Sequence, residues 1–193
     1  MIIDRDMEDP NAPTDQELVR RFLADRRASS FEILYERHTP YLFRVARRML
    51  GGNESAAEDA LQEAWIRAVS SLPRFRGESA LRTWLCGITL NCCRETWRRK
   101  AMLPIEAVSD SAGSAGGGDL NAVHLERALS RLDEPSREIV ELFDVLGHTH
   151  EEIAGILGIA IGTSKSRLFR ARETLRTFLG TDEKSASAKR SEP

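Results

Sequence analysis

The sequence is poor in cysteine and in aromatic residues and has no long apolar run, and these shortages exclude several classes of protein. Its three cysteines, Cys86, Cys92 and Cys93, lie in an apolar helical pattern and form no Cys-x-x-Cys pair, which argues against a metal site. We interpret them as small core residues in a reducing cytoplasm. No stretch resembles a signal peptide or a membrane span, so we expect a cytoplasmic protein without membrane insertion.

Charge of one sign is not in excess either, because the formal net charge is only -2. Binding to nucleic acid therefore cannot be argued from the total and has to come from charge segregation. Such segregation is present. The first segment of the chain is acidic, with Asp4, Asp6, Glu8 and Asp9. The segment around position 97 is basic, with Arg94, Arg98, Arg99 and Lys100.

A convergent set of catalytic or metal-binding residues is also lacking. His148, His150 and Glu151 resemble metal ligands, but no further ligand cluster accompanies them. We interpret them as turn and helix-start residues. Because no nucleophile and no group of metal-binding carboxylates is evident, we expect a protein that is not an enzyme, without catalytic residues, bound metal or cofactor.

The residues from 149 to 178 have the pattern of a helix-turn-helix unit. Thr149 and Glu152 form a capping box that starts a helix, and Gly158 suits the tight turn that follows it. A second apolar stripe then begins at Leu168. With that stripe inward, the outward side chains of the second helix are cations, a hydroxyl and one aromatic ring: Lys165, Ser166, Phe169, Arg170 and Arg172.

Such a helix fits the major groove of DNA, where Lys or Arg pairs with guanine and apolar groups meet thymine methyls. A purely solvent-exposed basic face is the alternative interpretation. The capped helix and the glycine turn before it favour DNA binding.

The first half of the chain predicts four helices. Capping boxes at Thr14–Glu17 and Ser55–Glu58 start the first and the third, and Pro40 should kink or divide the second, which runs from about 30 to 50. The third, to about residue 71, has a polar face with Asp59, Gln62, Glu63 and Arg67. From spacing alone, plain solvation is the favoured interpretation of that face.

A loop and a fourth helix complete this half. Phe75 lies between Arg74 and Arg76 in the loop, where it could stack on an unpaired base or equally close the edge of the domain. The fourth helix, from about 79 to 100, carries a polar stripe: Thr83, Gly87, Asn91, Arg94 and Arg98. Because its end combines Trp97 with three cations, we expect phosphate contact there.

No strand pattern occurs, so the fold class is all-α, with two helical domains joined by a flexible linker. We expect a disordered tail over 1–13, a first domain over 14–100, a second domain over 120–180, and a disordered tail over 181–193. The linker, 101–119, is rich in glycine, serine and alanine. In the second domain, Leu125, Leu129 and Leu132 mark one helix and Pro135 opens the next.

Read together, these segments resemble the extracytoplasmic-function sigma factors of bacterial RNA polymerase. The segment 56–68 is similar to region 2.2 of that family, 75–100 to regions 2.3 and 2.4, and 136–175 to region 4. The order and spacing of these motifs make the resemblance specific, and it covers about residues 14 to 180.

The resemblance implies roles for the polar residues. In this family, one motif binds the clamp helices of the largest polymerase subunit. The residues that match this motif are Asp59, Gln62 and Glu63. Those implied in minus-ten binding, where a flipped non-template base is captured, are Phe75, Arg76, Thr83, Asn91, Arg94 and Arg98. Those implied in minus-thirty-five binding are Thr163, Lys165, Ser166, Arg167, Phe169, Arg170 and Arg172.

The resemblance further implies a protein that is monomeric when free, with core polymerase, promoter DNA and an anti-sigma factor as partners. Ser164 departs from the family, which usually has valine there, and predicts a looser core under the second helix of the unit. Leu132-Asp133-Glu134-Pro135 replaces the usual Leu-Pro and shifts that turn.

Two other functions remain compatible with parts of the sequence. A stand-alone helix-turn-helix regulator would bind a specific, usually palindromic, site without polymerase. A nucleic-acid enzyme such as a recombinase would need the converging nucleophile or metal carboxylates that the sequence does not supply.

Overall fold

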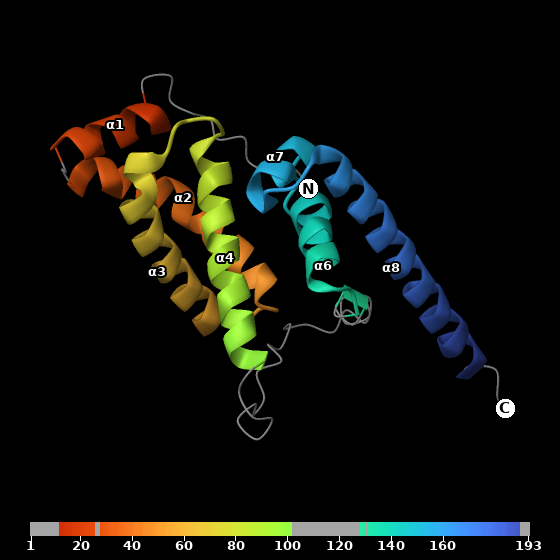
Figure 1. Cartoon of the computed structure of the whole chain (residues 1–193). Coiled ribbons are helices and arrows are strands. Elements are labelled where there is room, and N and C mark those ends of the chain that lie inside the picture. Colours follow the sequence, from red (N-terminus) through yellow and green to blue (C-terminus); the bar gives the residue numbers. More distant parts are fainter. Residues whose placement is uncertain (1–11, 26–27, 102–127, 130, 190–193) are drawn as a thin grey trace. The chain divides into compact units, whose positions relative to one another are not determined.

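The computed structural model describes residues 12–25, 28–101, 128–129 and 131–189, and every regular element in these ranges is a helix. The chain divides into two compact units, Met1–Ser114 and Ala115–Pro193 (Figure 1). The all-α fold class predicted from the sequence is confirmed. The expectations for the first tail up to residue 11, for the linker from residue 102, for Leu125 and for 190–193 lie outside the described residues.

The first unit is a bundle in which α2, α3 and α4 pack against one another and α1 packs on α2 (Figure 1). A single 3₁₀ turn, η1, follows α3. The elements are α1 (Asp15–Asp25), α2 (Ala28–Met49), α3 (Glu54–Ser71), η1 (Leu72–Arg74) and α4 (Leu81–Ala101).

Apolar stripes from all four helices form the core of this unit, because burying them is the main favourable term in folding. The prediction that the cysteines are small core residues is confirmed, since all three are free thiols no more than 1% exposed. Burial raises the pKa of the Cys92 thiol. The largest fully buried apolar side chains here are Leu18, Leu34, Leu42, Val45 and Leu90.

The helix ends agree with the sequence at one capping box and differ at another. The Thr14–Glu17 box is confirmed, because Glu17 N donates to Thr14 Oγ1 and Thr14 N donates to Glu17 Oε2. The Ser55–Glu58 box is wrong. Asn53 caps α3 instead, accepting from Ala56 N at 2.9 Å, since an asparagine two residues earlier already satisfies that donor.

Three further positions in this unit differ from the sequence patterns. Helix α2 runs continuously through Pro40, so the predicted division does not occur. Tyr35 is 42% exposed, although its helical spacing with Phe31, Leu34 and Leu42 predicts that it points inward. Thr83 is buried, although it belongs to the predicted polar stripe of the fourth helix. The reason is that α4 packs against both α2 and α3 and so buries more than one face.

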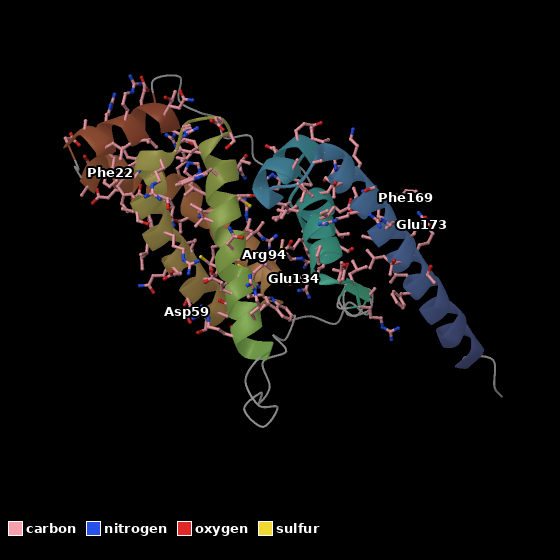
Figure 2. The ribbon with its side chains drawn as sticks, viewed as in Figure 1. Phe22, Asp59, Arg94, Glu134, Phe169 and Glu173 are labelled. Carbon is pink, nitrogen blue, oxygen red and sulfur yellow. The ribbon has the colours of Figure 1, made fainter. Side chains whose placement is uncertain are left out.

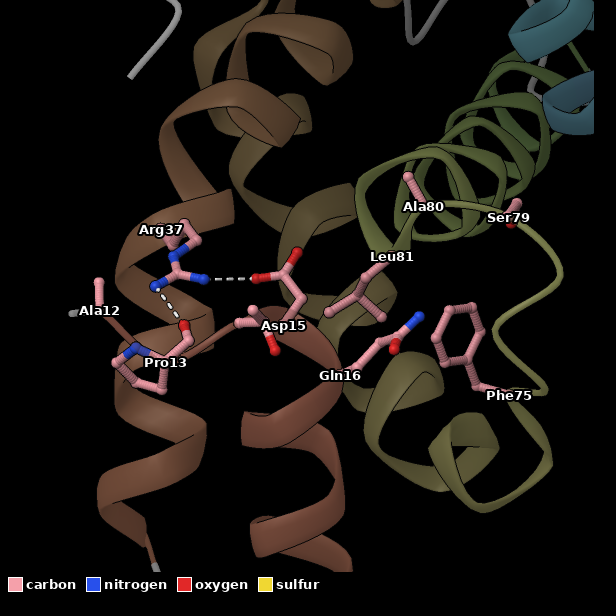
Figure 3. A pocket seen from close by; sticks show the side chains of 10 residues that line it. Ala12, Pro13, Asp15, Gln16, Arg37, Phe75, Ser79, Ala80 and Leu81 are labelled. Carbon is pink, nitrogen blue, oxygen red and sulfur yellow. Dashed lines mark hydrogen bonds and ion pairs between the residues drawn. The ribbon is translucent and has the colours of Figure 1, made fainter. Parts of the chain in front are cut away.

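An ion-pair cluster fastens α1 to α2. The Asp15 carboxylate accepts from Arg37 Nη1 at 2.7 Å (Figure 3). It also lies 2.9 Å from Nε2 of the buried His38. Arg37 also donates to the Pro13 carbonyl at 3.1 Å. Burial raises the pKa of Asp15, but the hydrogen bonds and charges of His38 and Arg37 outweigh burial and hold that pKa below its usual 3.8.

This cluster predicts an acid-sensitive contribution to stability. Because the pKa of Asp15 is lower in the folded than in the unfolded chain, the contribution is complete above pH 3.8 and is lost as pH falls through the lowered value. Asp15→Asn should reduce the free energy of unfolding by about 1 kcal/mol at neutral pH, a typical net value for a hydrogen bond. Urea titrations should find this difference shrinking below pH 3.8.

The exposed Glu36 on α2 provides the matched control, because Glu36→Gln removes one carboxylate without touching the cluster. A constant difference between wild type and Asp15→Asn down to strong acid would contradict the assignment.

The second unit places α6 and α7 against the long helix α8, with a π-helical segment, η3, after α6. Pro135 lies in the first turn of α6 as predicted, and Asp133 caps that helix. The elements are α6 (Glu134–Val140), η3 (Glu141–Val145), α7 (His150–Leu157) and α8 (Ile161–Lys189). The core is formed by Ile139, Leu142, Ile153, Leu168 and Ala171.

The helix-turn-helix pattern is confirmed in α7 and α8. Thr149 and Glu152 form both hydrogen bonds of the capping box. Gly158 ends α7 with φ at +66°, a left-handed conformation that favours glycine. Helix α8 continues to Lys189, so residues 181–189 are helical, although the sequence predicts a disordered tail there. Alanine, glutamate and lysine, which are good helix formers, occur in that stretch.

Candidate nucleic-acid and partner interfaces

The recognition face, which we define as the exposed face of the first half of α8, presents the predicted DNA-reading residues. Phe169 is 67% exposed, a high value for a phenylalanine, and it projects away from the packed side of the unit (Figure 2). Lys165, Ser166 and Arg170 are exposed beside it. Arg170 Nε donates to the Ser166 carbonyl at 3.3 Å. Thr163 and Arg167 flank the face and are partly exposed.

This face has the chemistry that major-groove readers use. Long cationic side chains can donate to guanine, and an exposed ring can contact thymine methyl groups. Leu168, Ala171 and Leu175 hold the opposite side of the helix in the core. The face is therefore supported by packed side chains beneath it.

Arg172, which is predicted to contact minus-thirty-five DNA, forms an ion pair within its own unit. Its guanidinium pairs with Asp144 of η3, with Nε at 3.2 Å from Oδ2, and lies 5.4 Å from the centre of the Phe143 ring. The hydrogen bond from Arg172 to Asp144 raises the pKa of the guanidinium. Both members of this pair are partly exposed, so the contact of Arg172 with DNA stays a prediction.

The structure also shows how a serine is accommodated at position 164, under the recognition helix. Its side chain is completely buried, and its Oγ lies 2.9 Å from Nδ1 of His150, the first residue of α7. The His150 ring stacks on Phe143 with ring centres 4.5 Å apart. The predicted loosening under the recognition helix is therefore offset by a hydrogen bond, because a buried hydroxyl with a partner avoids the cost of an unmade bond.

This hydrogen bond can be tested by stability measurements. Ser164→Ala should lower the free energy of unfolding of the second unit by about 1 kcal/mol, because it leaves His150 Nδ1 without its partner. His150→Ala should cost less in the Ser164→Ala background than in wild type. Urea unfolding of the four chains measures this coupling, with the exposed Ser166→Ala as a control. Equal costs in both backgrounds would mean that the two side chains do not interact.

In the first unit, α3 exposes a polar stripe at helical spacing. Asp59 and Gln62 are exposed, Glu63 is partly exposed, and Ile66, at 60%, continues the stripe with an apolar side chain. These positions follow the i, i+3, i+4, i+7 spacing of one helix face. We call Asp59, Gln62, Glu63 and Ile66 the docking stripe. Ile66 could have been recognised in the sequence from the same spacing.

A salt-bridge network holds Glu63 in place. Arg67 donates from Nε to Glu63 at 2.6 Å and from Nη1 to Glu95 of α4 at 2.6 Å. The hydrogen bond to Glu95 raises the pKa of Arg67 most, and the one to Glu63 raises it further. In turn, the hydrogen bond from Arg67 holds the pKa of Glu95 below its usual 4.5. The network therefore links the docking stripe to the helix that carries the predicted minus-ten residues.

An apolar groove of about 670 Å³ runs beside the docking stripe, between α2 and α3. Its floor is aromatic: Tyr35 and Trp65 lie 5.1 Å apart and Phe31 meets Trp65 edge-on at 5.5 Å. Gln62 and Ile66 belong to both the groove and the stripe. Exposed apolar surface next to polar side chains is typical of a protein-docking site.

The loop before α4 carries Phe75, which is partly exposed and lies 5.1 Å from Trp84 between ring centres. The Arg76 side chain is 83% exposed and lies 3.9 Å from Glu78. Phe75 borders a cavity of about 390 Å³ that α1, α2 and the start of α4 complete (Figure 3). The lining residues are Ala12, Pro13, Thr14, Asp15, Gln16, Arg37, Phe75, Ser79, Ala80 and Leu81.

Further along α4, the polar residues lie on the surface. Arg94 donates from Nη1 to the exposed Asn91 at 3.0 Å, and Arg98 is exposed one turn later. Trp97 is 40% exposed and donates from Nε1 to the Met49 carbonyl at 2.9 Å, which orients its ring. Thr83 is buried and does not join this surface. The other residues predicted to bind the minus-ten element are exposed or partly exposed, and Thr83 is not.

Among the described residues, no helix combines the length and apolar character needed to cross a membrane. Within the same ranges, no three His, Cys, Asp or Glu side chains are grouped so that they could hold a metal ion.

Comparison with known proteins relates each unit to a family model. Residues 34–102 match the model described as Sigma-70 region 2, and residues 123–175 match the one described as Sigma-70, region 4. The chain is 35% identical over 170 residues to the ECF RNA polymerase sigma factor SigM of Mycobacterium tuberculosis H37Rv, covering 86% of this chain and 85% of that protein. It is 31% identical over 180 residues to the ECF RNA polymerase sigma-E factor of Escherichia coli K12, covering 84% and 92%.

Two solved structures are similar in fold. One is CnrH in complex with the cytosolic domain of CnrY, with a TM-score of 0.66, 27% identity, and coverage of 87% of this chain and 98% of that one. The other is the sigma factor RpoE in complex with the anti-sigma factor NepR from Bartonella quintana, with a TM-score of 0.60, 30% identity, and coverage of 79% and 98%.

Proposed function

Because the chain belongs to the extracytoplasmic-function (ECF) sigma factors of RNA polymerase, we propose that its exposed surfaces divide the work of initiation between the two units. The first unit docks on core polymerase and holds the opened minus-ten strand. The second unit reads the minus-thirty-five element on intact duplex. The protein itself performs no covalent chemistry, since nucleotide addition belongs to the polymerase.

For docking, we assign the docking stripe and the adjacent groove to the clamp helices of the largest polymerase subunit. Asp59 and Gln62 offer exposed polar groups to the partner, and Glu63 is oriented by Arg67. Ile66 and the aromatic groove floor supply apolar area that becomes buried on docking. A few central, well-packed side chains usually carry most of the binding energy of such an interface.

For the minus-ten element, we assign the cavity beside Phe75 to a flipped non-template base and the surface of Arg76, Asn91, Arg94 and Arg98 to the strand. Unstacking a base costs a few kcal/mol, and contacts in a pocket together with stacking on an aromatic ring offset that cost. For the minus-thirty-five element, we assign base contacts to the recognition face and backbone contacts to Thr163 and Arg167.

For regulation, we propose an anti-sigma factor as partner, because two relatives of this fold are solved in complexes with CnrY and NepR. A partner that covers the docking stripe would compete with core polymerase. We further propose that the protein acts in the cytoplasm, where it meets the polymerase, and that it is monomeric when free.

The observation that supports this function most strongly is the occurrence of both sigma-70 regions, in order, on one chain with an exposed docking stripe. Run-off transcription with purified core polymerase on a promoter library tests it. We expect transcripts from defined start points that share two upstream elements. Transcripts that are the same with and without the protein would overturn the proposal, and tight specific binding to DNA in the absence of core would point to a stand-alone regulator.

A further inference from the structure

We propose that Gln16, on α1, determines which base the cavity beside Phe75 accepts. This inference rests on the proposed function, in which that cavity holds a flipped base of the minus-ten strand. It assigns a reading role to a helix that precedes the Sigma-70 region 2 match, which begins at residue 34.

The geometry places the Gln16 amide over the loop that carries Phe75. Gln16 Nε2 lies 3.7 Å from the position that a Cβ on Gly77 would occupy. The side chain reaches from the first turn of α1 toward the Phe75 ring (Figure 3). A base lying against Phe75 would therefore meet the Gln16 amide at its edge.

Most of the other polar side chains that line the cavity are committed elsewhere. Asp15 and Arg37 pair with each other, and Arg37 also holds the Pro13 carbonyl. Thr14 is engaged in the capping box with Glu17. Within the described part of the chain, the side chains of Gln16 and Ser79 form no hydrogen bond, so they are available to a ligand.

The Asp15–Arg37–His38 cluster positions Gln16. It fixes the first turn of α1 against α2, and Gln16 is the next residue after Asp15. With the backbone of this turn fixed, only the torsions of the Gln16 side chain lose freedom when it binds a ligand.

The chemistry of an amide suits this task. Glutamine carries a donor and an acceptor side by side and can form two hydrogen bonds with a base edge. A cavity of about 390 Å³ is within the usual range for small-ligand sites and cannot admit a base pair in a duplex. That volume suits a single unpaired base, which the proposed function brings to this cavity.

The substitution Gln16→Glu provides a directional test. A carboxylate only accepts hydrogen bonds, so the variant should favour the bases that carry an exocyclic amino group, cytosine, adenine and guanine, over thymine, which has none. Gln16→Leu removes both hydrogen bonds and should reduce any preference at that position to less than about twofold, from the roughly tenfold that one good base contact provides.

The experiment uses holoenzyme containing the full chain and fork-junction promoter DNA with each of the four bases at each non-template minus-ten position. Binding by wild type, Gln16→Leu and Gln16→Glu is compared in fluorescence titrations. Gln62→Leu is the matched control, because it changes the other glutamine of the chain, which lies on the docking stripe. It should weaken assembly with core without altering base preference.

The outcomes separate this inference from the function on which it rests. A change of preference at one position in both Gln16 variants supports it. An unchanged preference in both variants overturns the role of Gln16, even if Phe75→Ala weakens binding to the fork and so upholds the base cavity. Loss of binding to all four bases alike, together with a lowered Tm in both variants, would mean that Gln16 has only a structural role and would also overturn it.

Discussion

Replacing Asp59 and Gln62 together with alanine is expected to lower the affinity for core polymerase at least about 100-fold, which corresponds to a loss of about 1.4 kcal/mol for each of two interface side chains. Both side chains are exposed and lie one helical turn apart in the docking stripe. Because both side chains are exposed on the surface of the bundle, the fold should be unaffected, and Tm should change little.

The measurement is assembly of labelled protein with purified core, followed by fluorescence anisotropy. The matched control is Glu36→Ala with Ser29→Ala, which removes one carboxylate and one hydroxyl from exposed positions of α2. We expect less than about a twofold effect from that pair, as is usual for surface substitutions away from an interface. Undiminished assembly of the Asp59→Ala, Gln62→Ala chain would remove the docking assignment.

Lys165→Ala with Arg170→Ala should reduce transcription about 100-fold at a promoter with a strong minus-thirty-five element, because each good pair with a base contributes about 1–3 kcal/mol. Both side chains lie on the recognition face around the exposed Phe169. At a promoter whose upstream element is scrambled, the same variant should lose less than about threefold, since only phosphate attraction remains there.

Run-off transcription on the paired promoters, at two salt concentrations, measures the difference. Arg176→Ala is the control, because Arg176 is an exposed cation further along α8 and pairs with Glu173. An equal loss on both promoters would assign Lys165 and Arg170 to the phosphate backbone instead of the bases.

Much of the fold could be predicted because the relevant signals are local. The capping boxes at Thr14 and Thr149 and the turn at Gly158 involve residues within one helical turn of each other. The cap of α3 shows the limit of such reasoning. Asn53 and Ser55 are both good capping residues, and the sequence alone did not decide which of them caps the start of α3.

The candidate sites divide in the same way. The docking stripe and the recognition face each lie on a single helix, so helical spacing was enough to group their residues. The groove, the cavity beside Phe75 and the Arg67–Glu95 pair each combine side chains from separate helices. No local pattern relates such residues.

By itself, the sequence determined the helical class, the helix-turn-helix unit and the two exposed faces, because periodicity and capping act over a few residues. Only the tertiary structure decided which polar side chains are free to act. Packing α4 between its neighbours buried Thr83, an ion pair spanning 28 residues joined Arg172 to Asp144, and a hydrogen bond spanning 14 residues satisfied Ser164. Each of these depends on contacts between segments that are distant in the chain, where burial and pairing are set by how whole helices pack.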